Sequence, residues 1–338
     1  MPGGERAYAY AKACGIIGKS FIGKRLSGLQ NVTRLSELDR TIFPASSRDM
    51  PEKELLVDLE GRIIDRAVKS IITIVGCFPM PPEFLILLIR GYEYADLQNA
   101  LASFPDNEKS PPAHTELGSF GTVRFSAWPD IRAMIEGTAF GFLLDKNGKL
   151  KEEGITLQTT LDRHYYSALW KSLSSLSRKD RYAAEKILAD EISLKNSCWA
   201  LRLRTYYEMP LNELKNHLID IRVAKPGRRS LADEATDCLE FPLDDVAAWS
   251  SWRWKQFLNP VQGGEAWRAD PRYFQNAASR HLYRLAKRYF RMRPFSLDSV
   301  FCFIKLKQFE EDVLTSNAEG LGMGMSSRDV ISVLGVAE

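Results

Sequence analysis

A segment near the N-terminus, Cys14-Gly15-Ile16-Ile17-Gly18-Lys19-Ser20, has residue types that could bind a nucleotide phosphate. A P-loop needs a glycine, four further residues and then Gly-Lys-Ser or Gly-Lys-Thr, so that backbone N–H groups surround the phosphates. Ala13 stands where the first glycine is needed, and in the frame that starts at Gly18, Arg25 replaces the hydroxyl that binds magnesium. We therefore expect an amphipathic first helix that contains lysine, and no nucleotide site.

Residue types that serve in metal binding or nucleophilic catalysis are dispersed along the chain. The four histidines form no pair at i,i+4, and the five cysteines are an odd number without short spacings. No Gly-x-Ser-x-Gly motif occurs. Cys14 or Cys198 could act as a nucleophile only if the fold brought a histidine close. The sequence predicts no catalytic residue, no cofactor and no metal site.

Polar residues on apolar helix faces carry a different signal. Asn196 shares a stripe with Trp199 and Leu203, and Glu310 lies on the stripe of Phe303, Leu306, Val313 and Asn317. A buried amide or carboxylate needs hydrogen-bond partners, so we expect backbone or arginine groups to bind each of them. A catalytic role for Glu310 is the alternative. Asn99 is assigned the same structural role as Asn196, because Asp96-Leu97-Gln98-Asn99 shares its pattern with Ser193-Leu194-Lys195-Asn196.

One predicted helix has a strongly basic face. Five cations fall within about 100° on a helical wheel, and no acidic residue occurs between Asn276 and Leu297. They are Arg280, Arg284, Lys287, Arg288 and Arg291. A solvated face is one interpretation. The others are contact with an acidic protein partner, with anionic lipid head groups or, least favoured, with nucleic acid.

Helical periodicity dominates the segments that must position these residues. Apolar residues recur at three- and four-residue steps from Pro51 to Val75, and further helices are predicted to begin near Pro82, to cover 157–169 and to fill 177–209. Gly118 to Trp128 is the stretch with a weak hairpin signal, and Ala224 to Asp233 is expected to be a loop. The predicted fold class is all-α.

Length and composition bound the type of protein. The chain has 338 residues, 45% of them hydrophobic and 26% charged, and a formal net charge of +3, far below that of a dedicated nucleic-acid coat protein. The apolar stretch from Ser70 to Ile89 is interrupted by the Phe78-Pro79-Met80-Pro81-Pro82 sequence, and the first residues lack the pattern of a signal peptide. We expect a globular protein of a reducing, cytosolic compartment.

Two short matches suggest internal repetition. Besides the pair that ends at Asn99 and Asn196, Met209-Pro210-Leu211-Asn212-Glu213-Leu214 resembles Met325-Ser326-Ser327-Arg328-Asp329-Val330. Ser326 is suited to cap a helix with Asp329 in its first turn. The length fits three units of domain size, which we place at 1–115, 116–225 and 226–338.

The order of several segments resembles the C subunit of the archaeal and bacterial V/A-type ATPases, a relative of the d subunit of the eukaryotic vacuolar ATPases. The resemblance covers nearly the whole chain. Departures include Gln308, Ser193 and Leu321, where the family often has Glu, Asp and Lys, and residues 118–145 and 226–245 match nothing in the pattern. The segments that carry it are Tyr8-Ala9-Tyr10-Ala11-Lys12-Ala13, Tyr94-Ala95-Asp96-Leu97-Gln98-Asn99, Leu161-Asp162-Arg163-His164-Tyr165-Tyr166, Glu191-Ile192-Ser193-Leu194-Lys195-Asn196, Tyr207-Glu208-Met209-Pro210, Lys307-Gln308-Phe309-Glu310 and Gly324-Met325-Ser326.

The resemblance implies a funnel of three pseudo-repeated helical-bundle lobes that performs no catalysis. Such a protein would lie on the cytoplasmic face of the membrane as part of a complex. It would couple the central shaft, made of the D and F subunits, to the proteolipid rotor ring during ATP hydrolysis or synthesis and ion transport. The alternatives are a helical-repeat scaffold or nucleic-acid adaptor that uses the basic helix, and an all-α enzyme.

Overall fold

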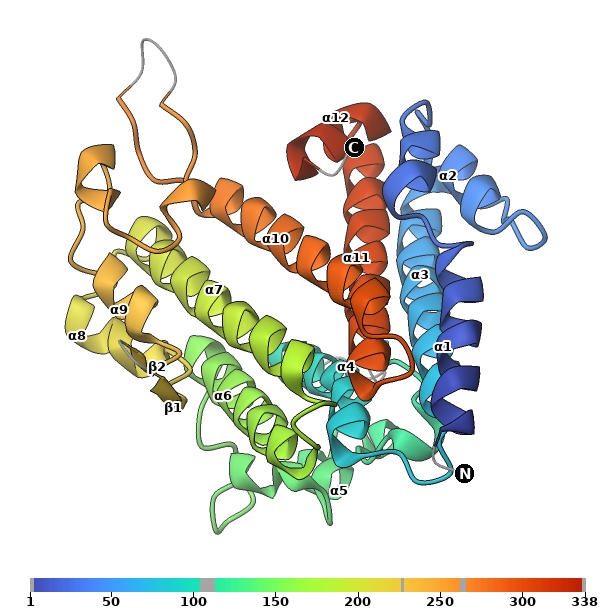
Figure 1. Ribbon diagram of the computed structural model, residues 1–338, viewed down its shortest axis with the longest axis horizontal. Coiled ribbons are helices and arrows are strands. Elements are labelled where there is room, and N and C mark those ends of the chain that lie inside the picture. The colour runs from blue at the N-terminus through green and yellow to red at the C-terminus, as the bar shows by residue number, and fades with distance from the viewer. Residues whose placement is uncertain (1–2, 104–112, 226–227, 262–265, 336–338) are drawn as a thin grey trace. The chain divides into compact units, whose positions relative to one another are not determined.

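The fold is all-α apart from one two-stranded hairpin in the part of the chain that the structure describes (Figure 1). The computed structural model describes residues 3–103, 113–225, 228–261 and 266–335. Contacts divide the chain into two discontinuous units: Met1–Met80, Ser177–Glu191 and Leu243–Glu338 form unit 1, and Pro81–Leu176 with Ile192–Pro242 form unit 2. The three-part division at residues 115 and 225, and the funnel, stay predictions.

Unit 1 is built from long helices that come from both ends of the chain. The predicted helix after Pro51 is confirmed as α3, and the basic helix is confirmed as α10, which begins with Pro271 after Asp270 has capped the Arg272 N–H. Ser326 caps α12 as expected, since it accepts the Asp329 N–H. The helices are α1 (Gly4–Ile17), η1 (Gly23–Leu29), α2 (Leu35–Ile42), α3 (Glu52–Val75), η8 (Val246–Trp249), η9 (Lys255–Phe257), α10 (Pro271–Met292), α11 (Leu297–Gly322) and α12 (Ser327–Leu334).

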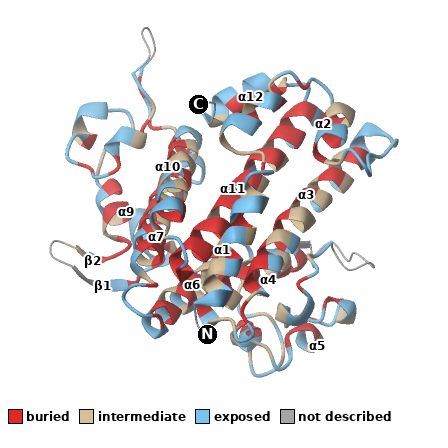
Figure 2. Cartoon of the chain, turned by 45° about the vertical axis from the view of Figure 1, so that its right-hand side comes forward, coloured by how far each residue is buried: buried red, intermediate tan, exposed pale blue. Residues whose placement is uncertain are grey.

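Helix α11 forms the centre of unit 1. It packs against α1, α2, α3, α10 and α12, and Figure 2 shows it buried along most of its length. Its close approach to α12 depends on Gly320, where a Cβ atom would lie 2.3 Å from the Cγ2 of Val330. Because neighbours cover α11 on several sides, its buried residues are distributed around the helix, which explains its weak amphipathic pattern.

A buried carboxylate joins the start of α11 to the start of α7 (Tyr182–Tyr206). Asp298 is fully buried and accepts the backbone N–H groups of Ala183 and Ala184, at 3.0–3.1 Å. It also pairs with Arg293 at 2.7 Å. Burial raises the pKa of Asp298, while the two N–H groups and the arginine oppose that shift. The carboxylate thus accepts hydrogen bonds from N–H groups in the first turn of α7, which have no partner within their own helix.

Unit 2 contains the helices of the middle of the chain and the C-terminal part of α7. The helix predicted near Pro82 is α4, and the one predicted at 157–169 is α6, which pack against each other. The elements are α4 (Glu83–Ser103), η3 (Gly118–Phe120), η4 (Phe125–Ala127), α5 (Ile131–Ile135), η5 (Ala139–Leu143), α6 (Gly154–Ser172), η6 (Leu173–Ser175), α8 (Leu211–Leu214), η7 (Lys215–His217), β1 (Arg222–Lys225), β2 (Arg228–Ser230) and α9 (Asp233–Cys238).

The weak hairpin signal between Gly118 and Trp128 does not correspond to a hairpin in the structure. The segment forms the short turns η3 and η4, because the buried carboxylate of Glu93 on α4 accepts the backbone N–H groups of Thr122 and Val123. Those N–H groups are then not available to a neighbouring strand. Apolar residues of this segment pack instead into a cluster with Leu97 and Leu161.

The antiparallel pair lies where a loop was expected. Strand β1 pairs with β2 in the register Arg222 to Ser230, on either side of residues 226 and 227. Asp233, in the first turn of α9, accepts the N–H groups of Arg229 and Ser230 at 2.7 and 3.0 Å. The carboxylate of Asp233 thereby holds β2 against the first turn of α9.

Removal of the Asp298 carboxylate tests its role at the start of α7. We expect Asp298→Ala to reduce the free energy of unfolding by about 3 kcal/mol, because two buried N–H groups and Arg293 lose their partner. Chemical denaturation with circular dichroism measures the change. The control is Asp329→Ala, whose exposed carboxylate binds Ser326, and we expect a loss of about 0.5 kcal/mol or less there. Equal losses in both variants would contradict the assignment.

Candidate functional site

Glu310 is the centre of a buried charged cluster in unit 1. Its side chain is 2% exposed, accepts the Phe21 N–H at 2.7 Å and contacts Arg66 at 3.3 Å. Lys307, one turn earlier on α11 and equally buried, donates to its other carboxylate oxygen and lies 3.4 Å from the Ser20 hydroxyl. The partners of Glu310 therefore include a backbone group and an arginine, as expected from the sequence. The third partner, Lys307, was not anticipated.

The cluster joins three separate segments of unit 1. Arg66 comes from α3, Phe21 and Ser20 from the segment after α1, and Glu310 and Lys307 from α11. Burial lowers the pKa of Lys307, and the adjacent Glu310 opposes that shift. A buried carboxylate whose oxygens are held by a backbone amide and two cations is suited to fixing geometry, and the arrangement supports the structural assignment over the catalytic one.

Asn196 lies on α7 within unit 2 and is 1% exposed. Its amide nitrogen donates to the carbonyl oxygens of Ile219 and Leu231 at 3.0 and 3.2 Å, and its oxygen accepts the Ile219 N–H at 2.8 Å. The side chain thereby connects the helix to the residues that flank the hairpin on both sides. Every one of these partners is a backbone group, as expected for an amide in a helix interface.

Asn99 differs from Asn196, although the two motifs share a pattern. It is exposed on α4, so its burial does not match that of Asn196. Asp96, one turn earlier on the same helix, is half-buried, and its carboxylate accepts the Thr115 N–H at 2.8 Å. Burial raises the pKa of Asp96, and the hydrogen bonds from Thr115 lower it. The helical phase of the motif relative to the core therefore differs between α4 and α7.

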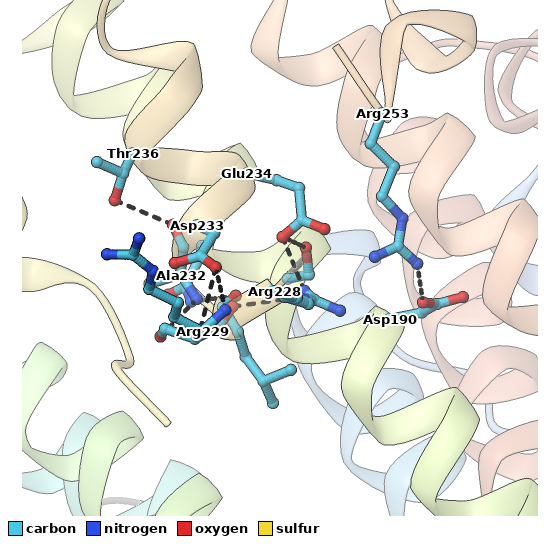
Figure 3. A network of polar contacts seen from close by, with 12 residues as sticks. Asp190, Arg228, Arg229, Ala232, Asp233, Glu234, Thr236 and Arg253 are labelled. Atoms are coloured by element: carbon cyan, nitrogen blue, oxygen red, sulfur yellow. Dashed lines mark hydrogen bonds and ion pairs between the residues drawn. The ribbon is translucent and has the colours of Figure 1, made fainter. Parts of the chain in front are cut away.

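A second polar network, which sequence reasoning missed, follows the hairpin in unit 2 (Figure 3). Arg228 donates to Glu234 at 2.8 Å, and the buried Ser193 hydroxyl donates to the same oxygen at 3.0 Å. Arg228 is largely buried, so the pair is shielded from water. The signal in the sequence is the basic Arg228-Arg229 followed by Asp233-Glu234, within residues 226–245 that matched no family pattern.

The five cations of α10 differ in their exposure to solvent. Arg284, Arg288 and Arg291 are exposed, whereas Arg280 and Lys287 are partly buried. Arg280 donates to the Leu334 carbonyl oxygen at 2.8 Å and so binds the end of α12. The ammonium group of Lys287 lies 5.4 Å from the centre of the Tyr283 ring. The face available to a partner is therefore the set Arg284, Arg288 and Arg291.

An acidic cavity of about 350 Å³ lies between α10 and α11 in unit 1. Its lining includes Ser279, Glu311, Asp312 and Glu319. Asp312 is partly exposed, but loss of hydration of its carboxyl group within the cavity raises its pKa to about 6. Lys305 opposes that shift of the pKa, and Glu191 adds to it. A concave surface of this kind favours cationic groups of a partner.

The histidines and cysteines are not gathered into one site. His164 contacts the Tyr94 hydroxyl at 2.6 Å, and His281 contacts Asp190 at 3.1 Å. Burial raises the pKa of Cys198, and it raises that of Cys238 to about 12, which disfavours the nucleophilic thiolate. Within the described ranges, no group of three or more His, Cys, Asp or Glu residues has an arrangement that could hold a metal ion.

Neutralising Glu310 tests the charged cluster. We expect Glu310→Gln to reduce the free energy of unfolding by about 3 kcal/mol, because Lys307 and Arg66 lose their countercharge in a buried place. The double variant Glu310→Gln/Lys307→Met should recover part of that loss. Asp65→Asn on α3 is the exposed control, with an expected change of about 0.5 kcal/mol or less. A Glu310→Gln protein as stable as the wild type in urea would contradict the assignment.

Asp312 gives a prediction for pH dependence. Because its pKa in the folded chain, about 6, lies above the usual value of 3.8, the folded state binds the proton more tightly. Its contribution to stability is therefore present in full below pH 4 and is lost as the pH rises through 6. Asp312→Asn should raise the melting temperature at pH 7.5 by about 2 °C and leave it unchanged near pH 4, as followed by calorimetry. A lower melting temperature at pH 7.5 would be the contrary result.

Comparison with known proteins identifies the family of this chain. The family model described as ATP synthase (C/AC39) subunit matches residues 47–331. An uncharacterized protein of Treponema pallidum (strain Nichols) is 27% identical over 321 residues, which cover 94% of this chain and 92% of the relative. Among the described residues, none of the helices is both long enough and apolar enough to cross a bilayer. Since the family model matches well over half of this chain, the chain belongs to the ATP synthase (C/AC39) subunit family.

Proposed function

We propose that this chain is a non-catalytic rotor subunit of a V-type ATPase. In this role it couples the central shaft, made of the D and F subunits, to the membrane proteolipid ring and so links ATP hydrolysis or synthesis to ion transport. It lies on the cytoplasmic face of the membrane as part of that complex. The observation that carries the proposal is the match to the ATP synthase (C/AC39) subunit family over residues 47–331.

The construction of unit 1 supports a mechanical role. A subunit that transmits torque must resist deformation, and its interior must have one arrangement. The buried groups of α11 are held by ion pairs to other elements: Asp298 to Arg293, Glu310 to Arg66, and Lys305 to Glu191 at 2.8 Å. Closely packed helices with paired charges favour a single rigid conformation.

Two charged surfaces of unit 1 are candidates for contacts within the complex. The exposed arginines of α10 suit an acidic partner, and the cavity that contains Asp312 suits a basic one. Opposite charges on separate surfaces favour a chain that binds different partners on different sides. The exposed part of the basic face, Arg284, Arg288 and Arg291, is the first surface to test.

Capture of the chain from native membranes tests the proposal directly. Membranes are solubilised in a mild detergent, the chain is captured through a C-terminal tag, and the proteins that accompany it are identified and quantified. We expect stoichiometric V-type A, B, D and proteolipid subunits. Recovery of the chain alone would contradict the rotor role, provided that density-gradient fractionation of the same membranes shows an intact ATPase that lacks this chain. Salt-sensitive binding to generic DNA would then favour an adaptor that uses the basic helix.

Charge reversal on α10 tests the contact surface. We expect Arg284→Glu/Arg288→Glu to reduce recovery of the other subunits at least tenfold, because two exposed cations become anions at the proposed interface. The melting temperature should stay within about 2 °C of the wild type, since both side chains are exposed. Asp65→Asn provides a control for an exposed charge on α3. Unchanged recovery would exclude this face from the interface.

A further inference from the structure

The end of α10 and the turn that follows it carry an exposed apolar patch. We define the aromatic patch as Tyr10, Tyr182, Met292 and Phe295, all of them in unit 1. Met292, Phe295 and Tyr182 are 60%, 55% and 53% exposed. Side chains of this size are more often buried, and a group of them on the surface indicates a contact.

Ring contacts place Tyr10 and Phe295 on one side of the end of α10, and Tyr182 on another. The Tyr10 ring on α1 lies 5.3 Å from that of Phe295 and 5.2 Å from that of Phe290. On the other side, the Tyr182 ring lies 6.1 Å from that of Tyr289 and 5.0 Å from the guanidinium of Arg293. Three separate parts of unit 1 thus bring aromatic rings to one place.

Phe295 has an unfavourable backbone conformation. Phe295 has φ of 59°, a left-handed conformation that a bulky residue adopts rarely and at a cost in stability. Glycine would fit this turn without strain. A strained turn that presents a half-exposed aromatic ring is not explained by the stability of the fold.

The charges around the aromatic patch are positive. Arg288 and Arg291 are exposed on the last turns of α10, and the Arg288 Nε atom lies 3.4 Å from the Met292 sulfur. Lys186 is exposed on α7, with its ammonium group 5.9 Å from the Tyr289 ring. Three nearby carboxylates are paired with arginines: Asp180 with Arg6, Glu185 with Arg181, and Asp298 with Arg293.

We propose that the aromatic patch and its surrounding cations bind the surface of a bilayer that contains anionic lipids. Tyrosine, phenylalanine and methionine side chains enter the region between head groups and acyl chains, and arginine and lysine attract anionic head groups while their stems cover apolar surface. The patch side chains stand at the ends of elements, and the cavity between α10 and α11 is lined by other residues. A broad lipid surface fits such protruding groups better than one protein side chain would.

The test uses the purified full-length chain and lipid vesicles, so its result does not depend on the rotor role. Binding is measured by flotation with vesicles of phosphatidylcholine alone and with vesicles that contain 30% phosphatidylglycerol, at 50 and 500 mM NaCl. We expect binding to the anionic vesicles at low salt, and at least tenfold weaker binding at high salt or without phosphatidylglycerol. No binding to anionic vesicles at low salt would overturn the proposal.

Variants separate membrane contact from folding. Phe295→Gly/Met292→Ser and, separately, Arg291→Gln/Lys186→Gln should each weaken binding at least tenfold. Phe295→Gly alone should weaken binding while its melting temperature stays equal to the wild type or rises, because relief of the left-handed strain offsets the lost ring contact with Tyr10. Met323→Ser, at the far end of α11 and 81% exposed, is the control that should bind as the wild type does.

Two further results would contradict the proposal. One is vesicle binding that the patch variants leave unchanged. The other is a wild-type chain that ignores vesicles, combined with patch variants that lose the ATPase subunits in the capture experiment. In that second case the patch would be a protein interface.

Discussion

Burial of α11 is the constraint on which the rest of unit 1 depends. A helix of 26 residues that neighbours cover on several sides buries some of its charged side chains together with its apolar ones, and each buried charge needs a hydrogen-bond or ion-pair partner. Asp298 meets the start of α7, and Glu310 meets Arg66 of α3 and the Phe21 amide. These contacts fix the position and the rotation of α11 relative to its neighbours, and the surfaces around α10 and α12 follow from that placement.

The helical elements could be predicted from the sequence because local patterns decide them. The spacing of apolar residues located α3 and α6, the basic face located α10, and the absence of glycine located the long α7. The need for partners also predicted that Asn196 and Glu310 contact backbone or arginine groups. For such residues, burial can be inferred from the neighbours on one helix face, and a buried polar atom leaves few alternatives.

Other features depend on contacts between residues far apart in the chain, which periodicity does not contain. Glu93 determines the path of Thr122 and Val123, and no pattern within that segment shows it. The exposure of Asn99 depends on how α4 is turned toward the core. The basic face of α10 loses Arg280 to the end of α12 for the same reason. The cavity around Asp312 is lined by residues of α3, α10, α11 and α12, so the pattern of one helix could not identify it.

The order in which the parts of unit 1 occur along the chain has a consequence for synthesis on the ribosome. Helices α1 and α3 are made early, but α11, which covers their apolar sides, is among the last elements to be made. At ordinary rates of translation, the wait is on the order of tens of seconds. During that time the apolar side of α3 has only α1 and α2 as neighbours from unit 1 and still lacks α11. Nascent chains of this protein are therefore expected to need chaperones that shield their first eighty residues until the C-terminal helices emerge.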